Sequence, residues 1–172
     1  MKIEDLGYDD FFEASRKEMG LDDFSVSRVM AEHKGAYKLI DQDGEFLAKV
    51  TGKRIFESSS REDYPAVGDW VAVKKTGGEQ ALIYEILSRK TIIKRKYGDK
   101  DRSGNKTETQ IIGTNIDVAF IVESVNRDYN LNRIERYLSL VSNGGVESAI
   151  ILNKIDLISS EELAMKLSEI KK

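Results

Sequence analysis

The stretch that decides the fold is residues 149–156, which read Ala-Ile-Ile-Leu-Asn-Lys-Ile-Asp. Four consecutive apolar residues predict a buried strand, and the polar residues after them predict a loop at its carboxyl end. Open α/β sheets bind ligands at the carboxyl ends of their strands. The stretch therefore indicates an α/β domain with a ligand-binding loop at Asn153, Lys154 and Asp156.

These three residues suit the recognition of guanine. The Asp156 carboxylate can accept hydrogen bonds from the ring N–H and the exocyclic amine of guanine, a pair of donors that adenine lacks. Asn153 and Lys154 would hold the loop and cover the base. Hydrogen bonds to a charged acceptor contribute about 1.5–3 kcal/mol each, enough to set a base preference. The pattern N-K-x-D thus predicts a site for a guanine nucleotide, GTP.

The phosphate-binding half of such a site is missing. No pair of glycines has the G-x-x-x-x-G-K-[ST] spacing of a phosphate loop. Residues 41–44 and 101–104 match the short D-x-x-G pattern of the Mg²⁺-side loop. Asp43-Gly44 predicts a hairpin turn instead, and the second stretch lies in a charged connection, so we interpret neither as a nucleotide motif. Either nucleotide binding has been lost, or the motif order is permuted and the remainder lies beyond Lys172.

Composition sets the outer limits. The 172 residues are 40% hydrophobic and 33% charged, as in ordinary soluble chains, and leave room for two small domains. The formal net charge of -3 does not point to nucleic acid. The absence of cysteine excludes a disulfide framework and a thiolate zinc site in this stretch. With no apolar run of membrane length and no signal peptide, we expect a cytoplasmic protein without a membrane partner.

The first half of the chain predicts a barrel. Residues 1–24 form an acidic lead with one helix, roughly Asp9 to Met19, whose aromatic residues pack on the next domain. Residues 25–93 carry five short strand patterns, at 26–33, 37–40, 46–50, 70–73 and 81–87. We expect a closed five-stranded OB-fold barrel that binds RNA, and an SH3-like barrel is the alternative. Trp70 and Tyr37 could stack on nucleobases, but a single Trp in a small barrel is more often in the core, so neither is taken as a site residue.

Residues 94–107 predict a basic linker loop. Residues 94–106 hold six basic and two acidic side chains, and Arg89 and Lys90 come just before them. A solvated linker is one interpretation, and contact with RNA phosphates is the other. The adjoining barrel favours RNA. The candidate contacts are Arg89, Lys90, Lys94, Arg95 and Lys96.

Residues 108–172 change to an α/β pattern. Strand patterns at 117–122 and 148–152 enclose a stretch with apolar residues at helical spacing, for which Asn132 and Glu135 are expected to form the cap. A last helix begins at Ser159 or Ser160. The order predicts a parallel β-α-β unit with the guanine loop at the end of its second strand. Two strands and two helices cannot cover both faces of a parallel sheet, so we expect about half a domain.

Four motifs stand in a fixed order: Gly68-Asp69-Trp70-Val71, residues 112–117, residues 131–138 and residues 152–157. In this order they resemble the ribosome small-subunit-dependent GTPase A family, circularly permuted P-loop GTPases of bacterial 30S subunit assembly. The resemblance implies an OB domain on 16S rRNA, then a GTPase domain whose base-reading motif precedes its phosphate loop, then a zinc domain. It implies GTP, Mg²⁺ and zinc as ligands. Only Asn153, Lys154 and Asp156 match functional residues of the family here.

Two hypotheses of function follow. In the first, the chain is the initial part of a GTP-binding and GTP-hydrolysing factor of 30S assembly. Its phosphate loop and its Mg²⁺ and zinc ligands then lie outside these residues, so the chain alone would be inactive, because phosphate contacts and metal supply most of the catalytic stabilisation. In the second, it is a non-catalytic RNA-binding OB module with a degenerate α/β appendage.

Overall fold

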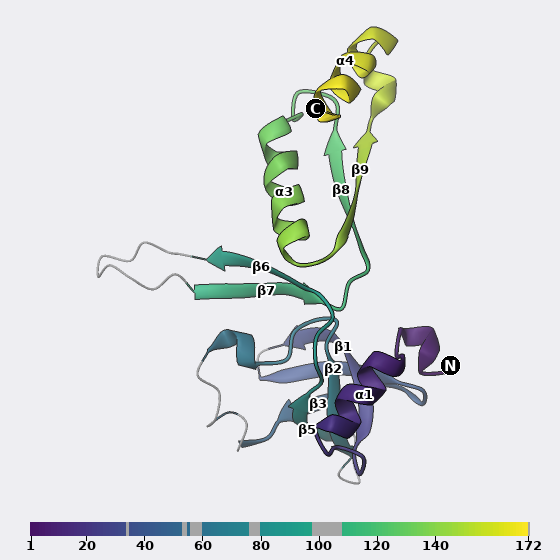
Figure 1. Ribbon diagram of the computed structural model, residues 1–172, viewed down its shortest axis with the longest axis vertical. Coiled ribbons are helices and arrows are strands. Elements are labelled where there is room, and N and C mark those ends of the chain that lie inside the picture. The colour runs from purple at the N-terminus through teal and green to yellow at the C-terminus, as the bar shows by residue number, and fades with distance from the viewer. Residues whose placement is uncertain (34, 53–54, 56–59, 76–79, 98–107, 172) are drawn as a thin grey trace, which may run out of the picture. The chain divides into compact units, whose positions relative to one another are not determined.

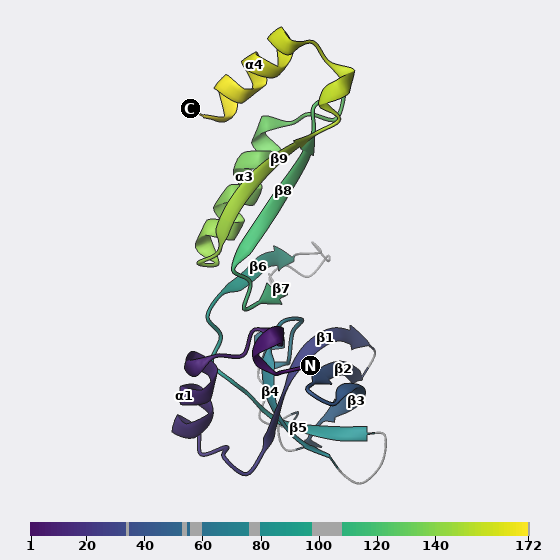
Figure 2. The same ribbon diagram turned by 90° about the vertical axis from the view of Figure 1, so that its right-hand side faces the viewer.

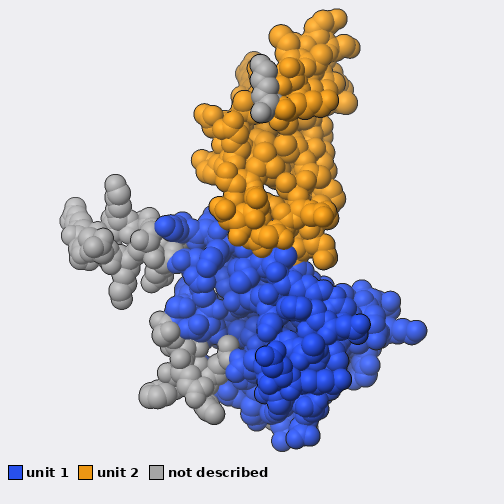
Figure 3. Space-filling view, in the orientation of Figure 1, with its two compact units in different colours: residues 1–115 blue, residues 116–172 orange. Residues whose placement is uncertain are grey.

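The computed structural model describes residues 1–33, 35–52, 55, 60–75, 80–97 and 108–171. The chain divides into two compact units, residues 1–115 and 116–172 (Figure 1 and Figure 3). Within the described ranges, no helix has the length and apolar character needed to cross a membrane. The second D-x-x-G match, residues 101–104, lies outside the described residues.

A closed five-stranded barrel dominates the first unit. Its strands are β1 (Ser25–His33), β2 (Ala36–Asp41), β3 (Gly44–Val50), β4 (Trp70–Lys75) and β5 (Gln80–Ile86). They pair in the order β1-β2-β3-β5-β4 and close on themselves, with β3 and β5 parallel and the other pairs antiparallel. This Greek-key closure confirms the expected OB-fold-like barrel.

Alternating side chains fill the barrel. On β2 the residues Tyr37, Leu39 and Asp41 are buried and their neighbours are not, as strand geometry requires. Gln42 and Asp43 form the turn into β3, which begins at Gly44, and the Asp41 carboxylate accepts from the Asp43 amide at 2.9 Å. The first D-x-x-G match is therefore a hairpin turn. The buried core comprises Val29, Tyr37, Leu39, Ala48, Val71, Val73, Ala81, Ile83 and Ile86.

The N-terminal lead packs on the outside of this barrel (Figure 2). It consists of a short 3₁₀ helix, η1 (Glu4–Leu6), and α1 (Asp10–Glu18), which Asp9 caps by accepting from the Phe11 amide. Trp70 is fully buried, and its ring lies 4.9 Å from that of Tyr8 and 5.9 Å from that of Phe12. The expected helix and the packing of Tyr8 and Phe12 are confirmed, whereas Phe11, which was expected to pack as well, is exposed.

A hairpin that the sequence did not reveal follows the barrel. Strands β6 (Ile92–Tyr97) and β7 (Glu108–Thr114) pair antiparallel as a separate two-stranded sheet. The expected linker loop at 94–107 is therefore wrong at its start, because residues 94–97 belong to β6, and residues 98–107 lie outside the described residues. Likewise, residues 112–115 close the first unit instead of opening the α/β part.

The end of β7 is fixed against the barrel at two points. Gly68 has φ +96°, and a Cβ there would lie 2.1 Å from the Thr114 carbonyl oxygen. Asn115, with φ 53°, is buried, and all its polar groups bond. Its N–H donates to Thr91, its side-chain amide to the Gly68 carbonyl at 3.0 Å, and its two oxygens accept from Lys90 and Arg28.

The second unit is the expected β-α-β unit. Strands β8 (Val118–Ser124) and β9 (Glu147–Asn153) are parallel, and α3 (Leu131–Asn143) lies along one face of the pair (Figure 1). Asn130, not Asn132, caps α3, since its side chain accepts from the Arg133 amide. The short η3 (Ile155–Leu157) then leads to α4 (Ser160–Ile170), whose capping box pairs Ser159 with Glu162, as expected.

The other face of this strand pair is apolar and open. Phe120 is 65% exposed and Val122 58% exposed, and both alternate with residues that face α3. Across from Val122, Ile151 of β9 is exposed as well. The unit thus has the uncovered face expected of about half an α/β domain.

The contact between Gly68 and Thr114 makes a testable prediction. Gly68→Ala should destabilise the chain by about 3 kcal/mol or more, because the new methyl group meets backbone that cannot move away. Gly20→Ala is the matched control: Gly20 also has positive φ but no neighbouring atom within 4 Å, so about 1 kcal/mol is expected. Urea unfolding followed by circular dichroism measures both. Equal losses in the two variants would show that the close approach does not constrain the fold.

Candidate functional site

The candidate guanine loop lies at the carboxyl end of the parallel strand pair. Asn153 is the last residue of β9 and pairs with Ser124, the last residue of β8. The loop Asn153–Asp156 therefore begins where both strands end, the position at which open α/β sheets bind ligands. This is the placement that the sequence pattern predicted.

Local hydrogen bonding shapes the loop. The Asn153 side-chain oxygen accepts from the Lys154 amide at 2.8 Å. Lys154 itself has φ 62° and ψ 35°, a left-handed conformation that is uncommon for residues other than glycine. This residue turns the chain sharply out of β9 into η3, which carries Asp156. Strained backbone conformations of this kind recur at active sites and ligand-binding loops.

All three predicted base-reading residues are exposed. The Asp156 carboxylate has no hydrogen bond or ion pair with the parts of the chain that the structure describes. A carboxylate without a partner at this position has oxygens that can accept from two donors of a ligand at once. The arrangement leaves Asp156 free for the role that the motif predicts.

Behind this loop lies an ion pair between a buried carboxylate and a partly exposed arginine, which sequence reasoning missed. Glu123, at the end of β8, is 2% exposed, and its carboxylate accepts from the Asn130 amide and from two nitrogens of Arg133. The hydrogen bond from Arg133 lowers the pKa of the Glu123 carboxyl, against the opposing effect of burial. The available signal was a single acidic residue inside the apolar run 118–125, followed ten positions later by a basic residue.

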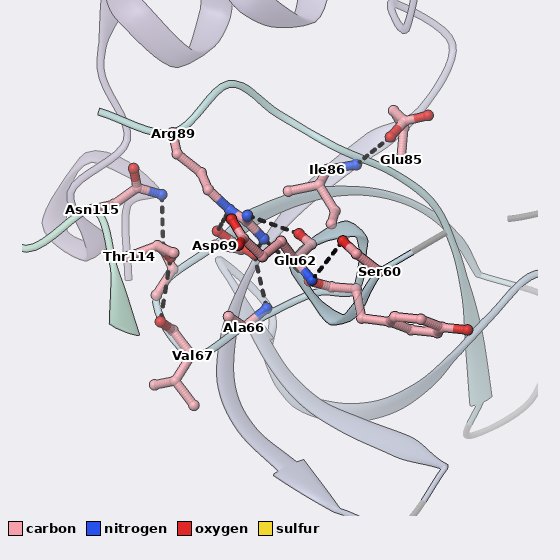
Figure 4. A network of polar contacts seen from close by, with 12 residues as sticks. Ser60, Glu62, Ala66, Val67, Asp69, Glu85, Ile86, Arg89, Thr114 and Asn115 are labelled. Carbon is pink, nitrogen blue, oxygen red and sulfur yellow. Dashed lines mark hydrogen bonds and ion pairs between the residues drawn. The ribbon is translucent and has the colours of Figure 1, made fainter. Parts of the chain in front are cut away.

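Arg89 is not available to a ligand. The Asp69 carboxylate is fully buried and accepts from the Arg89 Nε at 2.8 Å, from its Nη2 at 2.7 Å and from the Ala66 amide at 2.8 Å (Figure 4). The guanidinium also donates to the carbonyls of Glu62 and Tyr64. The RNA role expected for Arg89 is corrected: its donors hold Asp69 and the loop before β4.

Lys90 and Lys94 also have acidic partners. The Lys90 ammonium pairs with Asp9, the cap of α1, and lies 5.4 Å and 5.0 Å from the ring centres of Phe11 and Phe12. Lys90 thus holds the N-terminal lead rather than presenting a free charge. The Lys94 ammonium lies 2.9 Å from a Glu62 carboxylate oxygen, but half of its side chain remains exposed.

Arg95 and Lys96 are the more accessible of the predicted basic residues. Both are exposed on β6, and Arg95 donates to the neutral Gln110 side chain at 3.0 and 3.1 Å. Neighbouring side chains on a strand point to opposite faces. Lys94 and Lys96 therefore lie on one face of β6 and Arg95 on the other. Of the five candidates, Arg89 and Lys90 hold the fold, and the other three stand on this strand.

Two further features lie away from the guanine loop. A hollow of about 220 Å³ in the first unit is lined by Asp41, Asp43, Lys75 and neighbours, whose charges already pair with one another. Across the described ranges, no group of three or more His, Cys, Asp or Glu residues could hold a metal ion. The described residues therefore offer no cluster for the zinc that the resemblance implies.

Solved structures share this architecture. The crystal structure of YloQ, described as a circularly permuted GTPase, is similar with a TM-score of 0.57 and 20% identity, over 85% of this chain and 46% of that one. The crystal structure of YjeQ from Thermotoga maritima gives a TM-score of 0.61 at 21% identity, over the same shares. The fold of this chain is therefore shared with two solved structures, one of which is described as a circularly permuted GTPase.

The family follows from sequence. Residues 86–172 match the RsgA GTPase family, and this chain belongs to that family. A relative from Opitutus terrae, named small ribosomal subunit biogenesis GTPase RsgA, is 38% identical over 167 residues, 91% of this chain and 44% of the relative. A second, RsgA 2 of Lactiplantibacillus plantarum, is 38% identical over 83% of this chain and 38% of its own length. The chain spans less than half of these relatives.

The Asp69–Arg89 pair gives a prediction that separates folding from RNA contact. Arg89→Met should cost about 3–5 kcal/mol of unfolding free energy, because it leaves the buried Asp69 carboxylate without its cation. Arg95→Met, with an exposed side chain and a neutral partner, should cost less than about 0.5 kcal/mol. Urea unfolding tests both. A stable Arg89→Met variant that loses RNA affinity would restore the interpretation of Arg89 as an RNA contact.

Proposed function

We propose that this chain is the base-reading and RNA-contacting part of a GTPase that binds and hydrolyses GTP during assembly of the 30S ribosomal subunit. The observation that carries the proposal is the Asp156 carboxylate, which is exposed in η3 just after β9 and has no hydrogen bond or ion pair among the described residues, in a chain of the RsgA GTPase family. The names of the relatives, small ribosomal subunit biogenesis GTPases, supply the process. The compartment would be the cytoplasm, in keeping with the absence of cysteine.

Base recognition would use the exposed loop. Asp156 would accept from the two amino-side hydrogens of guanine, while Asn153 and Lys154 hold the loop and cover the ring. Because the chain lacks a phosphate-loop motif and its described residues lack a metal cluster, the phosphate contacts and Mg²⁺ ligands would come from other parts of the protein. The chain alone is therefore expected to bind guanine weakly and not to hydrolyse GTP.

RNA contact would use the basic strand β6. Lys94, Arg95 and Lys96 are exposed, and the adjoining barrel is of the kind that binds RNA in many proteins. Contacts to the 16S rRNA backbone release counterions, so they would make binding sensitive to salt. Arg89 and Lys90 are left out of this surface because Asp69 and Asp9 hold them.

The missing phosphate-loop motif favours a second candidate, a non-catalytic RNA-binding module with a degenerate α/β unit. The reading frame that follows Lys172 distinguishes the two. A G-x-x-x-x-G-K-[ST] motif followed by a Cys/His cluster supports the GTPase, whereas an immediate stop codon supports the module.

Asp156→Asn in the natural protein that contains this chain tests the base-reading role. An amide donates where the carboxylate accepted, so preference should move from GTP toward XTP, with GTP affinity falling at least about tenfold. Nucleotide affinities by titration calorimetry measure the change. Asp117→Asn is the matched control, since Asp117 is exposed at the opposite end of β8. Unchanged GTP affinity in Asp156→Asn would remove the basis of the proposal.

Neutralising Lys94, Arg95 and Lys96 together with glutamine tests the RNA surface. Association with 30S subunits should weaken, and the slope of log affinity against log salt should become shallower by about 2, as expected for three lost phosphate contacts. A variant with Lys2, Lys17 and Lys171 changed to glutamine removes the same charge elsewhere and should keep the slope. If both triple variants keep it, residues 94–96 are part of a solvated hairpin and not an RNA surface.

A further inference from the structure

The Glu123–Arg133 pair stands directly behind the guanine loop. In the β8–β9 register, Glu123 lies opposite Leu152, and the next pair is Ser124 with Asn153. The carboxylate is therefore one residue back from the first residue of N-K-x-D. The guanine motif itself uses neither Glu123 nor Arg133. Removing the Glu123 carboxylate from water costs free energy, so the pair calls for another explanation.

The pair fixes the course of the loop between β8 and α3. Glu123 accepts from the Asn130 amide at 3.0 Å, at the point where α3 begins. The Arg133 guanidinium donates to the Glu123 carboxylate and also to the Asp128 carbonyl. Within the loop, the Asn126 side-chain oxygen accepts from the Ser124 hydroxyl at 3.0 Å and from the Asp128 amide at 3.2 Å. The segment from Ser124 to Asn130 is thus held at both ends and in its middle.

This segment is joined to the guanine loop through the backbone. The Val125 amide donates to the Asn153 carbonyl at 3.1 Å, and Val125 is 1% exposed. Tyr129, near the other end of the segment, contacts α4: its hydroxyl lies 3.5 Å from Glu169, and the Lys166 ammonium lies 3.8 Å from its ring centre. The segment therefore contacts the residue before Lys154 and the helix after Asp156.

A buried carboxylate paired with an arginine favours one arrangement of such a segment. A buried carboxylate without its cation is costly, and a planar guanidinium satisfies it only in a narrow range of geometries. Any shift of the segment away from β9 would separate Glu123 from Arg133 or from the Asn130 amide. The pair thus resists displacement of the Val125 amide that anchors Asn153.

We propose that Glu123 and Arg133 are positioning residues for guanine recognition. They hold the segment Ser124–Asn130, the segment anchors Asn153, and Asn153 and Lys154 set the place from which Asp156 meets the base. This inference rests on the proposed function. It states that the pair determines how well the site discriminates guanine from a close analogue.

The test compares GTP with ITP in the natural protein that contains this chain. Inosine keeps the ring N–H but lacks the exocyclic amine, so the ratio of kcat/KM for the two nucleotides reports how well Asp156 is placed. Arg133→Met should lower this ratio about tenfold, mainly through the KM for GTP, with kcat retained. Arg133→Lys keeps the charge but loses the two-point contact, and should fall between Arg133→Met and the unmodified protein.

Controls separate positioning from general stability. Arg136→Met removes an exposed arginine from the same helix and should leave the ratio unchanged. Glu123→Gln keeps an oxygen for the Asn130 amide, so it should fold and still lower the ratio. If Arg133→Met does not fold, the GTP-to-ITP ratios of Arg133→Lys and Glu123→Gln test the positioning role instead.

The outcomes distinguish this inference from the proposed function. If Asp156→Asn changes nucleotide preference but Arg133→Lys and Glu123→Gln lose thermal stability with an unaltered GTP-to-ITP ratio, the pair is only structural and the inference is overturned. If Asp156→Asn leaves preference unchanged, the proposed function itself fails. A lowered ratio in the pair variants, with Arg136→Met unaffected, supports the positioning role.

Discussion

The buried carboxylate of Asp69 is the constraint on which the first unit depends. It stands before the first residue of β4 with no exposure to water, so the chain must bring donors to it. Arg89 supplies two and the Ala66 amide a third, and the remaining Arg89 donors bond to Glu62 and Tyr64. One ion pair therefore fixes the loop before β4 and the segment that leads into β6.

The second unit uses the same device at a different place. Glu123 is the last residue but one of β8, and Asp69 comes directly before β4. Arg133 fixes Glu123 together with a helix N-terminus instead of a loop. In both units, a buried acid near a strand end binds one arginine and at least one backbone amide. The two strands need no such pair for their own hydrogen bonds, so the pairs serve to place the loops next to them.

Sequence patterns predicted the elements whose signal is local. The five barrel strands, α1, the β-α-β order and the exposed position of Asp156 follow from alternation, helical spacing and a motif at a strand end. The hairpin β6–β7 was missed because a run of basic residues is typical of a solvated loop. The same basic residues can also occupy a two-stranded hairpin whose faces are exposed to solvent. Arg89 was misjudged because its partner lies twenty positions earlier, and nothing local shows that Asp69 is buried.

The packing of Trp70 decides how ligand binding to this chain can be observed. It is the single tryptophan of the sequence, enclosed by Phe12, Val26 and Leu87, all in the first unit. Intrinsic fluorescence excited at the indole therefore reports the surroundings of the barrel and α1, whereas the guanine loop belongs to the second unit, which has no tryptophan. Unchanged Trp70 emission during a nucleotide titration would therefore not show whether the guanine loop is occupied. A nucleotide that carries a fluorophore is the suitable reporter.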